Sequence, residues 1–236
     1  MALETCDIYE LLRLEINDKE LPGNGDSSLS LWSNEELYHY IDEAHREFAR
    51  DTLCLLDATT FDAVAITAGS AWVEFDERIV ELRRVYLNST GNMVEFMTLN
   101  DFERGNVYAA DYGAQRLNSS WKQTTGTPSV LITDMETGKG RLYPIPSADD
   151  SLEMIVYREP LYEIEDTNTD LEIDSKFRRA LINGAAMQAY SKDDVETYNG
   201  DAIRYHASLW EKAKQDALSF FRKKIRRAPV TTYGGI

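Results

Sequence analysis

The sequence predicts an α+β protein, in which a helical bundle carries an inserted small antiparallel β barrel or sandwich and an extended C-terminal tail. Apolar residues recur at helical spacing near both ends of the chain. The middle alternates with a period of about two and is rich in β-branched residues. We therefore expect residues 1–57 and 174–227 to form the helical bundle domain, residues 58–173 the inserted β domain, and residues 228–236 the tail.

Two helices are predicted before the β domain. A short helix starts at Thr5 or Asp7 and ends near Ile16, and a loop rich in Gly, Pro, Ser and Asp follows it. The stretch WSNEELYHYIDEAHREFARDTLCLLD then predicts one long amphipathic helix. Ser33 and Glu36 form a capping box pattern, in which each side chain satisfies a free backbone N–H at the other residue. The apolar stripe of this helix, which we expect to be buried, comprises Leu37, Ile41, Ala44, Phe48 and Leu55.

About six or seven strands with short turns are predicted from residue 58 onward. METGKG predicts the turn of a hairpin, and NDFERGNVY predicts a short helix that Asn100 caps. Short strands joined by short turns are typical of a small antiparallel barrel or sandwich. The segments that predict strands are FDAVAITAGSAWVEF, IVELRRVYL, MVEFMTL, TPSVLITD, GRLYPIP and SLEMIVYREP.

Two further helices are predicted after the β domain. Asp174 is expected to cap SKFRRALINGAAMQAYSK, and Asp193 or Asp194 starts a longer helix that ends near Arg227. The last residues of that helix, RKKIRR, place five cations where the helix macrodipole is negative. The first of the two helices contains small residues that permit close helix packing, namely Ala180, Gly184, Ala185 and Ala189.

Charge is distributed unevenly along the chain. There are 41 acidic and 25 basic residues, which give a net charge of −16. From Asp174 onward there are 12 basic and 7 acidic residues, a net charge of +5, whereas the part before it carries −21. Affinity for nucleic acid comes largely from Lys and Arg contacts to phosphate, so this acidic body is a poor candidate for binding it.

Cysteine usage and hydropathy indicate in which cellular compartment the protein is made. Cys6 and Cys54 are too few for a disulfide framework or a zinc site. No signal peptide is visible, and no stretch approaches the roughly 20 apolar residues that span a bilayer. We expect a soluble protein that makes no membrane contact and is made in a cytoplasm.

No set of residues converges on a catalytic pattern. His39 and Glu43 lie one helical turn apart and His45 lies nearby, but HExxH is absent, so we expect surface or interface histidines. The GxSxG nucleophile motif and the GxxxxGK[ST] phosphate loop are absent too. We therefore predict no catalytic residue, no metal and no cofactor. Because 34 acidic residues precede Asp174, an acidic hydrolase with a carboxylate pair stays an alternative, as does a regulatory module that binds another protein.

The basic helix end and the tail are the candidate binding element. The cations are compatible with contact to nucleic acid, with an acidic protein partner, or with simply completing the helix. Short segments such as APVTTYGGI order by adding a strand to a partner or by filling a pocket on it. The residues that we predict to bind a partner are Arg222, Lys223, Lys224, Arg226, Arg227, Val230, Tyr233 and Ile236.

The ordered series of segments resembles the head-to-tail connector adaptor proteins of tailed bacteriophages. The resemblance runs from about Trp32 to Tyr190, and the terminal helix continues it. It rests on the order of the segments, because no single motif is diagnostic. The segments are WSNEELYHYIDEAHREFARDTLCLLD, WVEFDERIVELRRVYL, GTPSVLITD, RLYPIPSADDSLEMIVYREP and FRRALINGAAMQAY.

The resemblance implies a structural protein of the virion neck, assembled in the host cytoplasm. Members of that family form a dodecameric ring below the portal, with a helical bundle and a C-terminal tail that reaches the portal; some carry an inserted β domain. The implied partners are the portal protein, tail or nozzle proteins of the neck, and further copies of this chain. DNA would pass through an acidic lumen without specific binding. The smaller relatives are mostly helical, so the β character of residues 58–173 is a departure from them.

Overall fold

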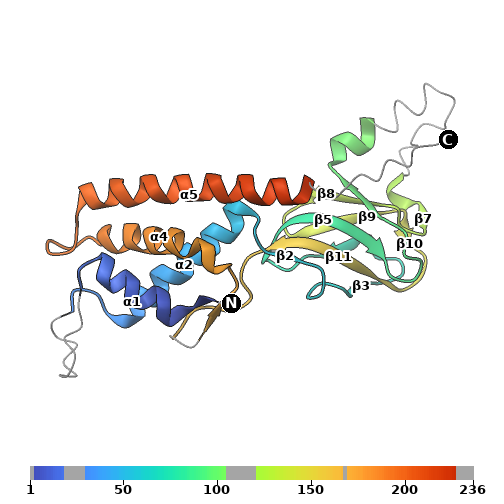
Figure 1. Ribbon diagram of the computed structural model, residues 1–236. Helices are drawn as coiled ribbons and strands as arrows, with labels where there is room; N and C mark the ends of the chain where they lie inside the picture. Colours follow the sequence, from blue (N-terminus) through green and yellow to red (C-terminus); the bar gives the residue numbers. More distant parts are fainter. Residues whose placement is uncertain (1–2, 19–29, 105–120, 167–168, 227–236) are drawn as a thin grey trace, which may run out of the picture. The chain divides into compact units, whose positions relative to one another are not determined.

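The structure, a computed structural model, is an α+β fold with four labelled α-helices and several short sheets (Figure 1). This confirms the predicted fold class. The predicted tail, residues 228–236, lies outside the described residues. The backbone is described for residues 3–18, 30–104, 121–166 and 169–226, and the side chains for these residues except 3, 4 and 224–226.

Contacts divide the chain into two compact units. One unit is Leu56–Arg158, and the other combines Met1–Leu55 with Glu159–Ile236. From the sequence we expected residues 58–173 to form the β domain. In the structure, Ile164, Leu171 and Ile173 pack into the hydrophobic core of the helical unit.

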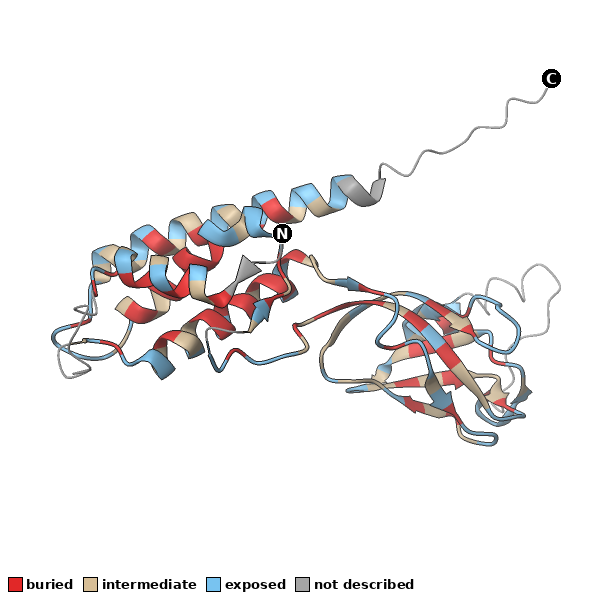
Figure 2. Ribbon diagram, turned by 60° about the horizontal axis from the view of Figure 1, so that its bottom comes forward, coloured by how far each residue is buried: buried red, intermediate tan, exposed pale blue. Residues whose placement is uncertain are grey.

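The helical unit is built around α4 (Arg178–Tyr190), which contacts each of the other three helices. Eight of its residues are buried, so it has almost no solvent face (Figure 2). A Cβ added at Gly184 would lie 3.1 Å from the Ala44 Cβ and 3.1 Å from Cζ3 of Trp210. The predicted role of small residues in close helix packing is therefore confirmed at this position. The other helices are α1 (Thr5–Glu15), α2 (Asn34–Thr52) and α5 (Gly200–Arg226).

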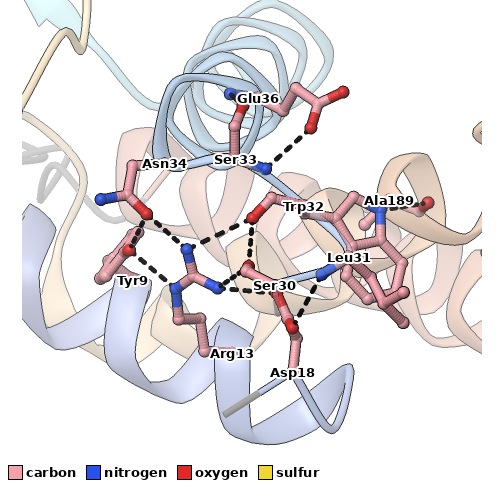
Figure 3. Close-up of polar contacts among 10 residues, drawn as sticks. All are labelled: Tyr9, Arg13, Asp18, Ser30, Leu31, Trp32, Ser33, Asn34, Glu36 and Ala189. Atoms are coloured by element: carbon pink, nitrogen blue, oxygen red, sulfur yellow. Dashed lines mark hydrogen bonds and ion pairs between the residues drawn. The ribbon is translucent and has the colours of Figure 1, made fainter. Parts of the chain in front are cut away.

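Helix α2 begins at the predicted capping box. The backbone N–H of Glu36 donates to Ser33 Oγ at 3.2 Å, and the N–H of Ser33 donates to Glu36 Oε2 at 2.8 Å (Figure 3). The helix ends at Leu53, whose left-handed φ of 52° breaks the helical repeat. The expected apolar stripe is buried at Leu37, Ile41, Ala44 and Phe48, and Leu55 is half-buried.

A buried arginine joins α1 to the start of α2. Arg13 is 6% exposed, and its guanidinium forms an ion pair with Asp18 at 2.7 Å. Asp18 in turn accepts from the Leu31 backbone N–H at 3.2 Å, so residues on both sides of the segment 19–29 meet at one carboxylate. Arg13 also donates to Tyr9 Oη, Ser30 Oγ, the Trp32 carbonyl and Asn34 Oδ1 (Figure 3).

Helix α5 starts later in the chain than predicted. We predicted a start at Asp193 or Asp194, but the helix begins at Gly200. Asn199 Oδ1 accepts the backbone N–H groups of Asp201 and Ala202, so the helix cap lies there. The acidic pair instead lies in a turn that connects α4 to α5.

The β unit contains two open four-stranded sheets, and its described residues form no closed barrel. In the first sheet, β11 (Asp150–Arg158) pairs with β5 (Ile79–Leu87) along one edge. Its other edge pairs with β2 (Leu56–Asp57) and β3 (Val64–Ile66). The second sheet has the order β4 (Trp72–Glu74), β9 (Lys139–Tyr143), β8 (Val130–Glu136), β6 (Glu95–Met97).

Two strand pairs depart from the expected antiparallel arrangement. Strands β6 and β8 run parallel, and so do the short strands β7 (Thr125–Gly126) and β10 (Ile145–Pro146). Parallel neighbours need a long connection, and residues 98–129 supply one between β6 and β8. The predicted hairpin is confirmed, because β8 and β9 pair antiparallel across the turn at Gly138, which has a φ of 73°.

The two ends of the β unit are fastened to each other. Leu56 pairs with Tyr157 and Asp57 with Val156, and the Arg158 Nε donates to Asp57 Oδ2 at 2.5 Å. Burial alone would raise the pKa of Asp57, but hydrogen bonds from two threonines and from the guanidinium outweigh it and lower the pKa. The stabilisation from this carboxylate is therefore present at neutral pH and is lost only as the pH falls through that lowered value.

The capping box makes a testable contribution to stability. Replacing Ser33 with alanine removes the acceptor of the Glu36 N–H, so we expect the free energy of unfolding to fall by about 0.5–2 kcal/mol. Urea denaturation followed by circular dichroism measures this. Ser208→Ala, an exposed position inside α5, is the matched control. Equal midpoints for Ser33→Ala and the unmodified protein would contradict the prediction.

The close approach at Gly184 is tested by a pair of substitutions. Gly184→Val adds branched bulk between Ala44 and Trp210, and overpacking of this kind costs about 1–3 kcal/mol. Gly184→Ala adds one methyl group and gains about 1 kcal/mol of helix propensity, so we expect a much smaller net change. Thermal unfolding measures both variants. If valine proved as well tolerated as alanine, the helices would not be in close contact there.

Candidate assembly site

The predicted binding residues cluster at the end of α5, and the structure describes part of that cluster. The side chains of Arg222 and Lys223 are exposed on the final turns of the helix. The backbone at Lys224 and Arg226 is helical, but their side chains are not described. The remaining predicted residues, Arg227, Val230, Tyr233 and Ile236, lie outside the described residues.

A shared lysine fixes α5 against α2. Lys214 is 8% exposed, and its Nζ lies 2.7 Å from Glu47 Oε1, 2.8 Å from Asp51 Oδ2 and 2.7 Å from Glu211 Oε1. Glu47 also accepts the indole N–H of Trp210 at 3.1 Å. One cation thus holds two carboxylates of α2 and one of α5.

The charge of Lys214 is secured by these contacts. Burial by itself would lower the pKa of its ammonium group, but the hydrogen bonds to the three carboxylates outweigh burial and raise the pKa. The group is therefore cationic throughout the physiological range. Apolar periodicity did not predict the role of Lys214. The signals in the sequence are Glu47 and Asp51, which lie four positions apart on α2, and a lysine among the apolar positions of α5.

An aromatic cluster holds the last packed turn of α5. Phe177 lies 5.5 Å from the Phe221 ring and 6.3 Å from the Phe220 ring, measured between centroids. Lys176 Nζ lies 4.0 Å from the Phe220 centroid, so a cation covers the cluster. Beyond Phe221 the described side chains are exposed, so the basic end begins where the packing ends.

The basic helix end favours binding to an anionic surface. Cations at a helix C-terminus are stabilised by the negative end of the macrodipole, so they cost little while they point into water. Neither Arg222 nor Lys223 forms an ion pair with another residue in the described part of the chain. Their charge is available to a partner.

The candidate histidines lie in different environments. His39 is exposed, whereas His45 is only 1% exposed, so the expectation of surface or interface histidines is wrong for His45. It lies beside Ala44 on the buried face of α2, where the apolar stripe is wide enough to include it. The described part of the chain contains no group of three or more His, Cys, Asp or Glu residues that could hold a metal ion.

The two cysteines, Cys6 and Cys54, are half-buried. Burial raises the pKa of the Cys54 thiol to about 11, so it is protonated at neutral pH and is a poor nucleophile. Among the described helices, none combines the length and apolar character needed to cross a membrane.

The comparison with protein families decides the identity of the chain. The SU10 adaptor protein family matches residues 7–233, which is nearly the whole sequence. This chain belongs to the SU10 adaptor protein family. The search of curated proteins found no match. The family consists of structural phage adaptors, so the coarser expectation is confirmed: this adaptor is a structural protein of a phage virion.

Substitution of Lys214 tests how much its ion pairs between α5 and α2 stabilise this adaptor. Lys214→Met keeps the apolar stem but leaves three carboxylates without their shared cation, and we expect a loss of about 1.5–3 kcal/mol of unfolding free energy. Lys212→Met removes an exposed charge two residues away, and we expect a change within about 0.5 kcal/mol. Chemical denaturation of both variants measures the difference. Similar losses in the two variants would show that the network does not stabilise the bundle.

Proposed function

We propose that this adaptor forms a ring beneath the portal, joins the capsid to the tail, and lets DNA pass through an acidic lumen. The observation that carries the proposal is the exposed basic end of α5 on a chain of net charge −16. Family membership supplies the context of a phage adaptor. The resemblance to head-to-tail connectors supports a dodecamer and a place in the neck of the virion.

The attachment element in this proposal is the end of the chain. The Lys214 network and the Phe177 cluster fix α5 up to Phe221, so the cations that follow start from a rigid base. A rigid base lowers the entropy that a partner must remove on binding. We propose that the tail docks on the portal while the cations meet acidic groups beside it, with tail or nozzle proteins bound elsewhere on the ring.

The lumen in this proposal repels DNA. A lumen wall of net negative charge does not attract the phosphates of DNA, so the DNA passes through without binding to the wall. The charge of the chain before Asp174, −21, supports this part of the proposal.

Assays of portal binding distinguish the contribution of the tail, residues 228–236, from that of the five cations of RKKIRR. Deleting residues 228–236 should leave helix content and thermal stability almost unchanged yet abolish or greatly weaken assembly on portal rings. Changing the five cations of RKKIRR to glutamine should weaken assembly in a salt-dependent way, because screening acts on exposed charges over about 10 Å at 0.1 M salt. Negative-stain imaging and sedimentation of mixtures with the portal of the same virus measure both effects.

The control for the charge change removes the same number of exposed cations from other surfaces. We expect it to assemble like the unmodified protein. Assembly of the tail deletion at the level of the full chain would overturn the tail as the attachment element. The control variant changes Arg84, Arg104, Lys122, Arg178 and Arg204 to glutamine.

A further inference from the structure

The helical unit has an apolar groove between the start of α4 and the middle of α5, two helices that lie side by side (Figure 1). The volume of the groove is about 440 Å³. Phe177 and Ala180 line it at the start of α4, and Leu209 and Ala213 line it on α5. The bundle therefore presents apolar surface to its surroundings beside its packed core.

Helix α5 carries a second apolar stripe along this groove. Tyr205, Leu209 and Ala213 are spaced four residues apart, so they follow one side of the helix, and Phe220 continues the same side. Tyr205 is 56% exposed and Phe220 is 45% exposed, whereas Trp210 on the core face is 1% exposed. We call Tyr205, Leu209, Ala213 and Phe220 the outer stripe of α5. The described residues of the bundle leave this stripe partly uncovered.

Two charges of opposite sign lie in the middle of the outer stripe. Lys212 and Asp216 line the groove and are exposed, and neither forms an ion pair within the part of the chain that the structure describes. Lys176 and Arg179, the other cations of the groove, already form ion pairs at 2.9 Å. The unpaired charge of the groove is therefore one cation and one anion, four residues apart on the same helix.

This pattern is complementary to itself when a second α5 lies antiparallel to the first. If the two helices cross level with residue 214, Lys212 of each copy lies opposite Asp216 of the other, because both residues are equally distant from that level. The outer stripe then continues on both sides of the two ion pairs. Residues 205–220 span about 22 Å at 1.5 Å per residue, so the contact extends over about four helical turns. A parallel arrangement would instead place like charges opposite each other.

We propose that the free protein forms a twofold dimer through an antiparallel pair of α5 helices. The outer stripe supplies the apolar contact, and the two ion pairs between Lys212 and Asp216 set the direction of the helices. Such an interface is isologous, because both copies use the same patch. The inference goes beyond the proposed function: a single ring is built from heterologous contacts, so the twofold dimer concerns the chain before it assembles.

Charge reversal in the full-length protein tests the proposed contact. Lys212→Glu and Asp216→Lys each place like charges opposite each other at two symmetry-related positions, so we expect each variant to dimerise at least about tenfold more weakly. Sedimentation equilibrium at several protein concentrations measures the dissociation constant. Arg104→Glu and Glu43→Lys make the same charge changes at exposed positions elsewhere and should dimerise like the unmodified protein. An unmodified protein that is monomeric at every concentration, or equal effects in the control variants, overturns the proposal.

A mixture of the two charge-reversal variants tests the antiparallel direction of the pairing. In a mixed dimer, the carboxylate introduced at position 212 of one variant lies opposite the ammonium introduced at position 216 of the other. The native Asp216 of the first lies opposite the native Lys212 of the second. We expect the mixture to dimerise about as strongly as the unmodified protein, although neither variant does so alone. A mixture that stays monomeric overturns the proposal, because damage to the fold or to another contact would not be repaired by mixing.

A substitution in the outer stripe tests the apolar contact. Tyr205→Ser should weaken the dimer several-fold, because large aromatic side chains at the centre of an interface contribute most to binding. Tyr162→Ser changes a tyrosine that is 69% exposed and lies outside the outer stripe, and it should leave dimerisation unchanged. Both variants should keep the denaturation midpoint in dilute solution, where a weak dimer dissociates. Unchanged dimerisation of Tyr205→Ser overturns the role of the stripe.

The dimer and the proposed function are tested by separate readouts. Sedimentation of the free protein reports on the twofold dimer, and assembly on portal rings reports on attachment. A protein that assembles on the portal but stays monomeric when free refutes this inference and leaves the proposed function standing. A dimer that responds to charge reversal, in a protein that does not assemble on the portal, supports this inference and refutes the proposed function.

Discussion

The helical unit depends on the close approach of three helices to α4. Because α4 carries Ala and Gly at its contacts, the indole of Trp210 and the side chains of α2 lie directly against its backbone. A helix this buried has almost no solvent face, so it is stable only inside the bundle. The positions of α1, α2 and α5 follow from it, and with α5 the position of the basic end.

Buried ion pairs connect segments that are distant in the sequence. Arg13 and Asp18 join the two sides of the segment 19–29, and Lys214 joins α2 to α5. Asp57 and Arg158 join the two ends of the β unit. A buried pair is expensive to break, because removing one partner leaves an unpaired charge away from water. These networks therefore make alternative packings of the same helices and strands unfavourable.

Local patterns predicted the fold better than they predicted the site. The capping box at Ser33, the apolar stripe of α2 and the β8–β9 hairpin depend on neighbours in the sequence, and each is found. The start of α5 was misplaced because Asn199 caps it instead of the acidic pair before it. Periodicity also missed His206 and Lys214, which are polar residues on the buried face of α5 with partners far away in the sequence.

Charge alone indicates the proposed binding site only in outline. An acidic chain with one basic run indicates where an anionic partner would bind, and Arg222 and Lys223 are exposed as that reading requires. The divergence of β6 from β5 left no signal in the sequence. It results from a strand that changes partner after Val94, and such a change depends on tertiary packing rather than on the residues of the strand.

The pairing of the two ends of the β unit has an evolutionary consequence. Leu56 and Tyr157 are partners in one ladder, so the chain leaves the helical unit and returns to it at almost the same point. A gene that lost the intervening codons would need only a short turn to reconnect α2 with the residues after Arg158. The β unit can thus be inserted, exchanged or removed at a single point of the chain without interrupting any helix of the helical unit.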